Sequence, residues 1–162
     1  MPVKPIPYGV ADYKSLIEEE YVYVDKTMYI RSLEQAGKYL LFLRPRRFGK
    51  SLFASTLGYY YDIAQKDNFE TLFSGTDIGR NPTTRRNAYY VLNFDFSDVE
   101  TSSDEILYES FTDKVHEALL TFRDTYKLDL ALKMGRPASQ LSTFFREFRR
   151  NCDGKMVLRK LS

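Results

Sequence analysis

The stretch Arg44-Pro45-Arg46-Arg47-Phe48-Gly49-Lys50-Ser51 lies between a five-residue apolar run, Tyr39 to Leu43, and a run with helical spacing, Leu52 to Tyr61. A buried strand, a tight turn and a helix in this order leave unpaired backbone N–H groups and the positive end of a helix dipole directed at one point. An anion is stabilised at such a point. The stretch therefore indicates a phosphate-binding loop, and it decides which fold the remaining sequence has to fit.

The end of this stretch fits the pattern G-x-x-x-x-G-K-[ST], in which backbone N–H groups and a lysine hold phosphates. Gly49 would supply the bend that lets the backbone approach, and Lys50 would reach the β- and γ-phosphates. The Ser51 hydroxyl would supply one oxygen to a phosphate-bound Mg²⁺. The first position of the pattern, usually Gly, is Arg44 here, so the pattern alone does not separate a Walker A loop from a basic surface loop.

Positive charge is concentrated in the same stretch. Four cations fall within seven residues, namely Arg44, Arg46, Arg47 and Lys50. Their mutual repulsion is unfavourable unless the charges are solvated or face a multivalent anion. A triphosphate would relieve this repulsion, and the alternative is a solvated basic loop beside a buried strand.

The segment Tyr23-Val24-Asp25-Lys26-Thr27 precedes Leu43 to Leu52, which contains the loop R-P-R-R-F-G-K-S. Together they resemble the AAA-ATPase-like family, a bacterial group of P-loop proteins whose longer members often carry a C-terminal nuclease-like domain of the PD-(D/E)XK type. The loop of that family has the same letters, so Arg44 is the residue that the resemblance implies. The resemblance continues through Leu72–Ile78 and Val91–Ser97, and so covers nearly the whole chain.

This resemblance implies a nucleotide as the ligand, with ATP and Mg²⁺ as the expected pair, although the sequence does not distinguish ATP from GTP. Ser51 is the expected Mg²⁺ ligand, acting together with the bound nucleotide. The segment Asp25-Lys26-Thr27 either contacts the nucleotide or caps a helix. The predicted nucleotide-binding residues are Arg44, Pro45, Arg46, Arg47, Phe48, Gly49, Lys50 and Ser51.

A second family element, Walker B, is missing from the sequence. In the family, the segment that corresponds to Asp153-Gly154-Lys155 is followed by an apolar strand ending in an acidic pair, whereas here residues 156–162 read M-V-L-R-K-L-S. Mg²⁺ coordination and water positioning are what phosphoryl transfer requires of a protein. Asp95, at the end of another apolar run, is the alternative carboxylate, but the family pattern makes it a strand-end residue. Nucleotide binding is therefore predicted, whereas ATP hydrolysis is left open and no catalytic residue is assigned.

Composition limits the other function classes. A chain of 162 residues with 43% apolar residues and a net charge of +2 is expected to form one globular domain or part of one, without a general attraction to nucleic acid. Cys152 is the single cysteine and His116 the single histidine, which excludes an intrachain disulfide and a cysteine-based zinc site. The sequence has no apolar window near the ~20 residues of a membrane helix. These features predict a cytoplasmic protein without membrane contact.

The pattern along the chain predicts alternating helices and strands. Strands are predicted at Tyr21–Val24, Leu40–Leu43 and Tyr89–Phe96 from β-branched, aromatic and continuous apolar runs. Ser102-x-x-Glu105 is predicted to cap a long helix that reaches Tyr126. The other predicted helices are Asp12–Glu20, the segment from Asp25 to Leu33, Lys50–Tyr61, a short patch from Phe69 to Phe73, and a last helix after the break at Gly135-Arg136-Pro137.

The expected fold is therefore α/β, an incomplete P-loop NTPase three-layer sandwich with parallel strands, truncated before the Walker B strand. Residues 1–38 would form an N-terminal extension and residues 39–162 the incomplete P-loop core. Two buried strands with unpaired edges predict marginal stability, aggregation, or completion by a missing C-terminal region or a partner chain.

Two other functions stay open at this point. One is a truncated, inactive fragment that acts at most as an interaction module. The other is a module associated with nucleic acid, although no known nucleic-acid fold signature is present. The arginines of that second alternative lie in a loop, Arg80, Arg85 and Arg86, and on the last helix, Arg146, Arg149 and Arg150.

Overall fold

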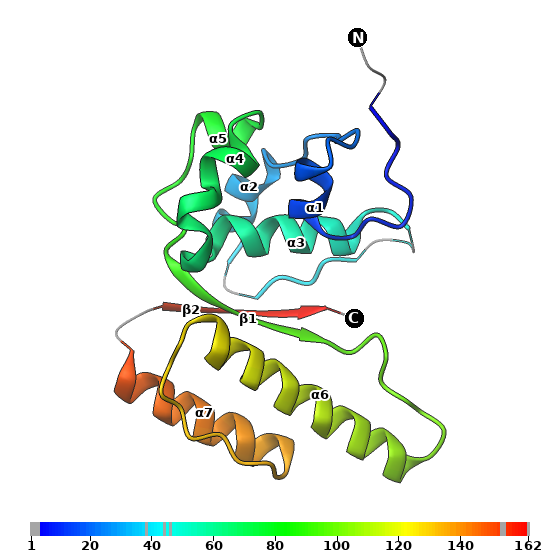
Figure 1. Ribbon diagram of the computed structural model, residues 1–162, viewed down its shortest axis with the longest axis vertical. Helices are drawn as coiled ribbons and strands as arrows, with labels where there is room; N and C mark the ends of the chain where they lie inside the picture. The colour runs from blue at the N-terminus through cyan, green and yellow to red at the C-terminus, as the bar shows by residue number, and fades with distance from the viewer. Residues whose placement is uncertain (1–3, 38, 44, 46, 153–154, 162) are drawn as a thin grey trace. The chain divides into compact units, whose positions relative to one another are not determined.

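The computed structural model describes residues 4–37, 39–43, 45, 47–152 and 155–161, the last range for its backbone alone. The chain divides into two compact units, Met1–Ala88 and Tyr89–Ser162. Each unit has its own cluster of buried apolar side chains, and both units are drawn in Figure 1. The boundary after Ala88 lies inside the range 39–162 that the sequence analysis assigns to one P-loop core.

The first unit is built from short helices around one longer helix, α3 (Lys50–Tyr61). Figure 1 shows α3 along one side of this unit, with the shorter helices on its other side. Aromatic side chains dominate the core, and the buried Tyr13 hydroxyl donates to the Leu72 carbonyl at 2.8 Å. The shorter elements are α1 (Tyr13–Glu18), α2 (Tyr29–Gln35), the 3₁₀ helix η1 (Ile63–Asn68), α4 (Phe69–Phe73) and α5 (Asp77–Arg80).

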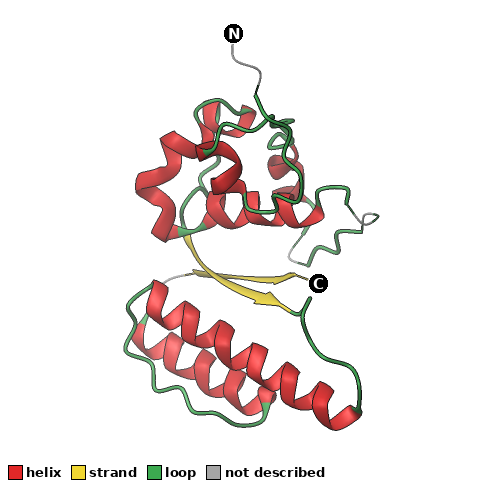
Figure 2. Cartoon of the chain, turned by 45° about the vertical axis from the view of Figure 1, so that its right-hand side comes forward, coloured by secondary structure: helices red, strands yellow, loops and turns green. Residues whose placement is uncertain are grey.

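The second unit contains two long helices, α6 (Asp104–Thr125) and α7 (Pro137–Asn151), and two strands, β1 (Tyr89–Asp95) and β2 (Lys155–Leu161). The strands pair in parallel, from Tyr89 opposite Lys155 to Asp95 opposite Leu161. Figure 2 distinguishes the helices and strands of this unit by colour. Alternate β1 residues, Leu92 and Phe94, are buried in one cluster with side chains of both helices.

The backbone of Val91, in the middle of β1, is hydrogen-bonded to the side chain of Tyr126. The Tyr126 hydroxyl accepts a hydrogen bond from the Val91 N–H at 2.7 Å, and it lies 3.4 Å from the Val91 carbonyl oxygen, to which it donates. The same residue packs against Tyr90 and Phe122 in edge-to-face contacts. Tyr126 therefore fixes the end of α6 against the middle of β1.

The predicted three-layer α/β sandwich is wrong. The described chain is mostly helical, and the apolar run at residues 39–43, predicted to be a buried strand, has no regular secondary structure. Its Leu41 and Leu43 are 83% and 79% exposed. Among the described residues, β1 pairs with β2 alone, and two strands do not form the central layer of a sandwich. A continuous apolar run predicts a strand only if neighbouring strands exist to bury it.

Several smaller predictions are corrected or confirmed by the helix and strand bounds. The predicted strand at Tyr21–Val24 is an irregular segment in which the Val22 N–H donates to the Pro5 carbonyl at 2.9 Å. The residue that caps α6 is Ser103, whose side chain accepts from the Ile106 N–H, rather than Ser102. The helices predicted at Lys50–Tyr61, at Phe69–Phe73 and after the Gly135-Arg136-Pro137 break are confirmed.

Candidate functional site

The N-terminus of α3 lies where the phosphate-binding pattern predicts it. Gly49 is the N-cap residue with φ of +73°, a left-handed conformation, and Lys50 and Ser51 are the first two residues of the helix. An added Cβ at Gly49 would meet no atom within 4 Å, so the backbone angle, and not lack of space, favours glycine there. Arg47 also has a positive φ, +66°. The chain thus turns sharply just before the helix begins.

The first turn of α3 lies at the surface, and no side chain among the described residues caps it. The Gly49 carbonyl accepts the first helical hydrogen bond, from the Phe53 N–H at 2.9 Å, and the first four N–H groups of a helix have no partner within it. α3 has no side-chain cap. Gly49 and Ser51 are exposed and Lys50 is half-buried, so these donors and both side chains lie at the surface.

The described helices differ in how they begin, and α2, α4 and α7 also lack a side-chain cap. The α6 helix is capped by the Ser103 side chain, and α7 has Pro137, which lacks an N–H group, at its first position. The short helix α1 is capped by Asp12. An uncapped N-terminus with a lysine in its first turn is the arrangement that an anionic ligand would complete.

The other predicted loop residues are only partly placed. Pro45 and Phe48 are exposed, Phe48 to 62%. Arg44 and Arg46 lie outside the described residues. Before the loop, the Phe42 ring packs against Phe53 of α3, with ring centroids 5.3 Å apart. The structure therefore places Gly49, Lys50 and Ser51 together at one helix end, and it leaves the contribution of the arginines as a prediction.

Asp25 and Thr27 cap a helix, but a different helix from the one expected. The two Asp25 carboxylate oxygens accept from the Thr27 N–H at 2.8 Å and from the Asp77 N–H at 2.7 Å, and the Thr27 hydroxyl accepts from the Ile78 N–H at 3.1 Å. Asp77 and Ile78 begin α5, whereas the next helix in sequence, α2, has no side-chain cap. These bonds occupy the polar atoms that the sequence offered to a nucleotide.

Replacing Asp25 by Ala tests this assignment. The variant loses the carboxylate that accepts from the Asp77 N–H at the start of α5, beside the N-cap residue Thr76, and we expect the free energy of unfolding to fall by about 1 kcal/mol. ATP affinity, measured well below the melting temperature, should stay the same. A loss of affinity without a loss of stability would instead make Asp25 a nucleotide contact.

A second polar cluster joins α1 to α3 and was not predicted. The Asp12 carboxylate accepts hydrogen bonds from the Ser55 hydroxyl at 3.0 Å and from the Tyr59 hydroxyl at 3.1 Å, both on α3. It also accepts from the N–H and the hydroxyl of Ser15 in α1. No local pattern identifies this cluster, because Asp12 and Ser55 are 43 residues apart in the sequence.

These hydrogen bonds determine the ionisation of Asp12. Burial alone would raise its pKa, but the bonds donated by the Ser15 amide and by three hydroxyl groups outweigh burial, and the pKa of Asp12 lies below its ordinary value of 3.8. Since the pKa is depressed in the folded state, the ionised group contributes stability above the ordinary pKa. This contribution is lost as the pH falls through the lowered pKa.

Most of the arginines assigned to nucleic acid have contacts within the chain. Arg80 donates to the Gly75 carbonyl at 3.4 Å, and the Arg86 guanidinium lies 4.4 Å from the centre of the Phe69 ring. On α7, Arg146 and Arg150 both lie within 4 Å of the Glu147 carboxylate. These four arginines therefore have partners within the chain, and binding of nucleic acid stays a prediction.

The other polar side chains singled out in the sequence contact neighbouring residues of the chain. The His116 ring nitrogen Nδ1 and the Gln140 side-chain oxygen are 2.7 Å apart, and Cys152 packs at the edge of the apolar cluster of the second unit. Asp95 accepts from the N–H and the hydroxyl of Ser97. Within the described part of the chain, no group of three or more His, Cys, Asp or Glu side chains is placed to hold a metal ion.

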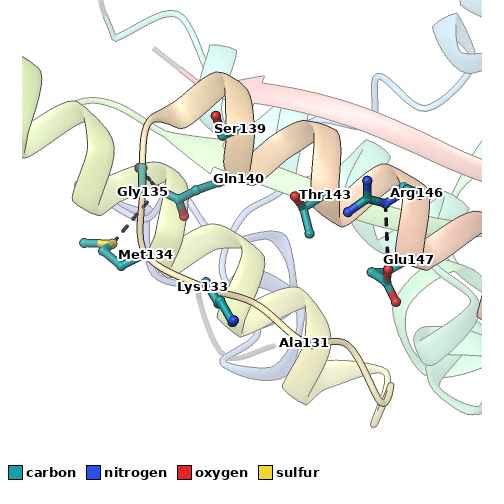
Figure 3. Close-up of a pocket in the computed structure, with 9 residues that line it drawn as sticks. All are labelled: Ala131, Lys133, Met134, Gly135, Ser139, Gln140, Thr143, Arg146 and Glu147. Atoms are coloured by element: carbon teal, nitrogen blue, oxygen red, sulfur yellow. Dashed lines mark hydrogen bonds and ion pairs between the residues drawn. The ribbon is translucent and has the colours of Figure 1, made fainter.

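A pocket of about 430 Å³ lies in the second unit between the loop before α7 and α7 itself. Figure 3 shows its lining, with Gln140 and Arg146 among the labelled side chains of α7. Gln140 donates to the Gly135 carbonyl at 2.7 Å, and Arg146 is paired with the neighbouring Glu147. These four lining residues therefore bond within the chain.

Comparison with known proteins identifies the family. Residues 7–158 match a family described as "Predicted AAA-ATPase", and because this match covers most of the chain, the chain belongs to that family. The predicted resemblance is thus confirmed, whereas the nuclease-like domain of longer members stays a prediction. An uncharacterized protein in the vnfD 5′ region of Azotobacter chroococcum mcd 1 is 44% identical over 55 residues, which are 33% of this chain and 11% of that protein. This chain therefore matches about a tenth of the length of that relative. No solved structure matches the chain.

Across the helices that the structure describes, none is both long enough and apolar enough to cross a lipid bilayer.

Proposed function

We propose that the chain binds ATP with Mg²⁺ at the loop Arg44–Ser51 and the first turn of α3. The observation that carries the proposal is the start of α3, where a left-handed Gly49 precedes Lys50 and Ser51 at a helix end without a side-chain cap. Membership of a family described as predicted AAA-ATPases supports ATP as the nucleotide. The four cations of this loop add the charge that a triphosphate requires.

Each group would have a separate task. The free N–H groups at the start of α3 would donate to phosphate oxygens, and the Lys50 ammonium would neutralise charge on the β- and γ-phosphates. Ser51, in the next position, would offer its hydroxyl oxygen to Mg²⁺ bound to the same phosphates. Bound Mg²⁺ would neutralise phosphate charge. The proposal is restricted to binding.

Isothermal titration calorimetry with Mg-ATP, inorganic tripolyphosphate and adenosine tests the proposal directly. Mg-ATP and tripolyphosphate should both bind, and adenosine should bind much more weakly, because the site is built around phosphates. Absence of heat with both phosphate ligands at millimolar concentration would reject the phosphate site.

Ser51→Ala should remove the increase in ATP affinity that Mg²⁺ provides. We expect ATP affinity in the presence of Mg²⁺ to fall about tenfold, the effect of losing one interaction of about 1.4 kcal/mol. ATP affinity in EDTA should be nearly unchanged. Ser32→Ala, which removes an exposed hydroxyl from α2 in the same unit, is the matched control. Equal losses with and without Mg²⁺ would show that Ser51 does not act through the metal.

A second function, an interaction module completed by a partner chain, is favoured by one observation. Tyr39, Leu41 and Leu43 are 96%, 83% and 79% exposed, and exposed apolar runs of this kind mark contact surfaces or aggregation sites. We infer that a partner strand could cover this segment. In the same titrations, absence of ATP binding together with self-association that rises with protein concentration would favour this function over the nucleotide site.

A further inference from the structure

The Asp12 carboxylate links α1 to the middle and C-terminal half of α3. Asp12 precedes α1 as its N-cap residue, and one of its oxygens accepts from both Ser55 and Tyr59 of α3, at 3.0 and 3.1 Å. Its other oxygen accepts from Ser15, within α1. A single side chain therefore caps one helix and binds another.

Ser55 is the central residue of this link. It is 8% exposed, and its hydroxyl both donates to Asp12 and accepts from the Tyr13 N–H at 3.0 Å. Because both roles of the hydroxyl are used, removing it would leave the Tyr13 N–H without its partner and Asp12 with one donor fewer. A buried backbone N–H without a partner is unfavourable.

The position of Ser55 on α3 connects this link to the proposed nucleotide site. Ser55 follows Ser51 by four residues, which is about one helical turn and about 6 Å along the axis. Within that turn, α3 has no cap of its own to hold its first residues in place. The Phe42 and Phe53 rings also pack together near the start of the helix, and the Asp12 carboxylate adds charge-assisted hydrogen bonds to this contact.

We propose that Asp12 is a positioning residue for the nucleotide site, acting through Ser55 on the first turn of α3. The inference rests on the proposed function. Asp12 does not touch the phosphates. It fixes where the free N–H groups, Lys50 and Ser51 point, and phosphate affinity depends on the convergence of these groups.

Ser55→Ala breaks the link while Asp12 keeps its bonds to Ser15, and the melting temperature records the loss of the Tyr13 N–H acceptor. We expect the affinity for both Mg-ATP and tripolyphosphate to fall about tenfold, the effect of one hydrogen bond to a charged group. Ser15→Ala is the matched control, since it removes a hydroxyl from the same carboxylate on the α1 side alone, and its affinity should equal that of the wild type. All dissociation constants are measured at least about 20 °C below each melting temperature, so that no variant is partly unfolded.

A double-variant cycle separates positioning from general weakening of the fold. If Asp12 acts through Ser55, then Ser55→Ala should lower ATP affinity in the wild-type chain and have little further effect in the Asp12→Ala chain. Additive effects on affinity, or wild-type affinity in Ser55→Ala despite a lower melting temperature, would overturn the inference. Failure of the wild-type chain to bind either phosphate ligand would reject the proposed function itself, which is a different outcome.

Discussion

Lys50→Ala is expected to lower the affinity for Mg-ATP by about 100-fold, while the chain without nucleotide becomes slightly more stable. The affinity falls because a charge-assisted contact with the phosphates is worth roughly 1.5–3 kcal/mol. The stability rises because Lys50 is the first residue of α3, where a cation opposes the helix dipole by about 0.3–1 kcal/mol. Opposite signs for affinity and stability are a specific signature of a phosphate-binding lysine.

Thermal unfolding with and without Mg-ATP measures both effects. At a ligand concentration of 100 times the dissociation constant, binding stabilises the folded chain by about 2.7 kcal/mol, and Lys50→Ala should lose nearly all of that stabilisation. Lys66→Ala, which removes an exposed lysine from η1, should keep the full nucleotide shift. An unchanged shift in Lys50→Ala would remove Lys50 from the site.

Gly79→Ala is expected to destabilise the first unit by about 3 kcal/mol or more, the upper range for a side chain forced into filled space. A Cβ at this position would lie 1.8 Å from the Phe73 carbonyl oxygen and 2.5 Å from the Phe73 carbonyl carbon. That carbonyl cannot move aside easily, because it accepts from the Thr76 N–H at 2.9 Å and from the Thr76 hydroxyl at 2.7 Å. The Phe73 side chain is itself fully buried.

Urea unfolding followed by circular dichroism measures this loss. Gly75→Ala is the matched control, four residues earlier, because an added Cβ there meets no atom within 4 Å. It should change the unfolding free energy by less than about 0.5 kcal/mol, as surface substitutions usually do. Similar stability of Gly79→Ala and the wild type would mean that α4 and α5 do not pack as described.

The sequence predicts an element correctly where the element depends on residues close to one another in the chain. The apolar spacing from Leu52 to Tyr60 predicted α3, and the Gly49-Lys50-Ser51 pattern predicted where that helix begins. The prediction of a buried strand in the apolar run at residues 39–43 is wrong, because its burial depends on strands that the described chain does not supply. A local pattern indicates which secondary structure a segment favours. It does not indicate whether another strand is present to pair with that segment.

The carboxylates around the candidate site could not be predicted from the sequence, because their partners lie far away along the chain. Asp25 bonds to Asp77 across 52 positions, and Asp12 bonds to Ser55 across 43. Carboxylates next to threonine or tyrosine are too common to indicate such distant partners. The sequence therefore indicates the residues at the start of α3, and it does not reveal the distant carboxylates that bond to α3 and α5.

The contact of Tyr126 with Val91 has a consequence for assembly. Because the phenol hydroxyl bonds to the N–H and the carbonyl of Val91, it takes the backbone groups that an incoming strand would use at this point. Strand edges are the usual starting points of uncontrolled sheet growth. Tyr126 thus hinders the pairing of another strand with the middle of β1. An added strand would first have to displace a tyrosine that is packed against Tyr90 and Phe122.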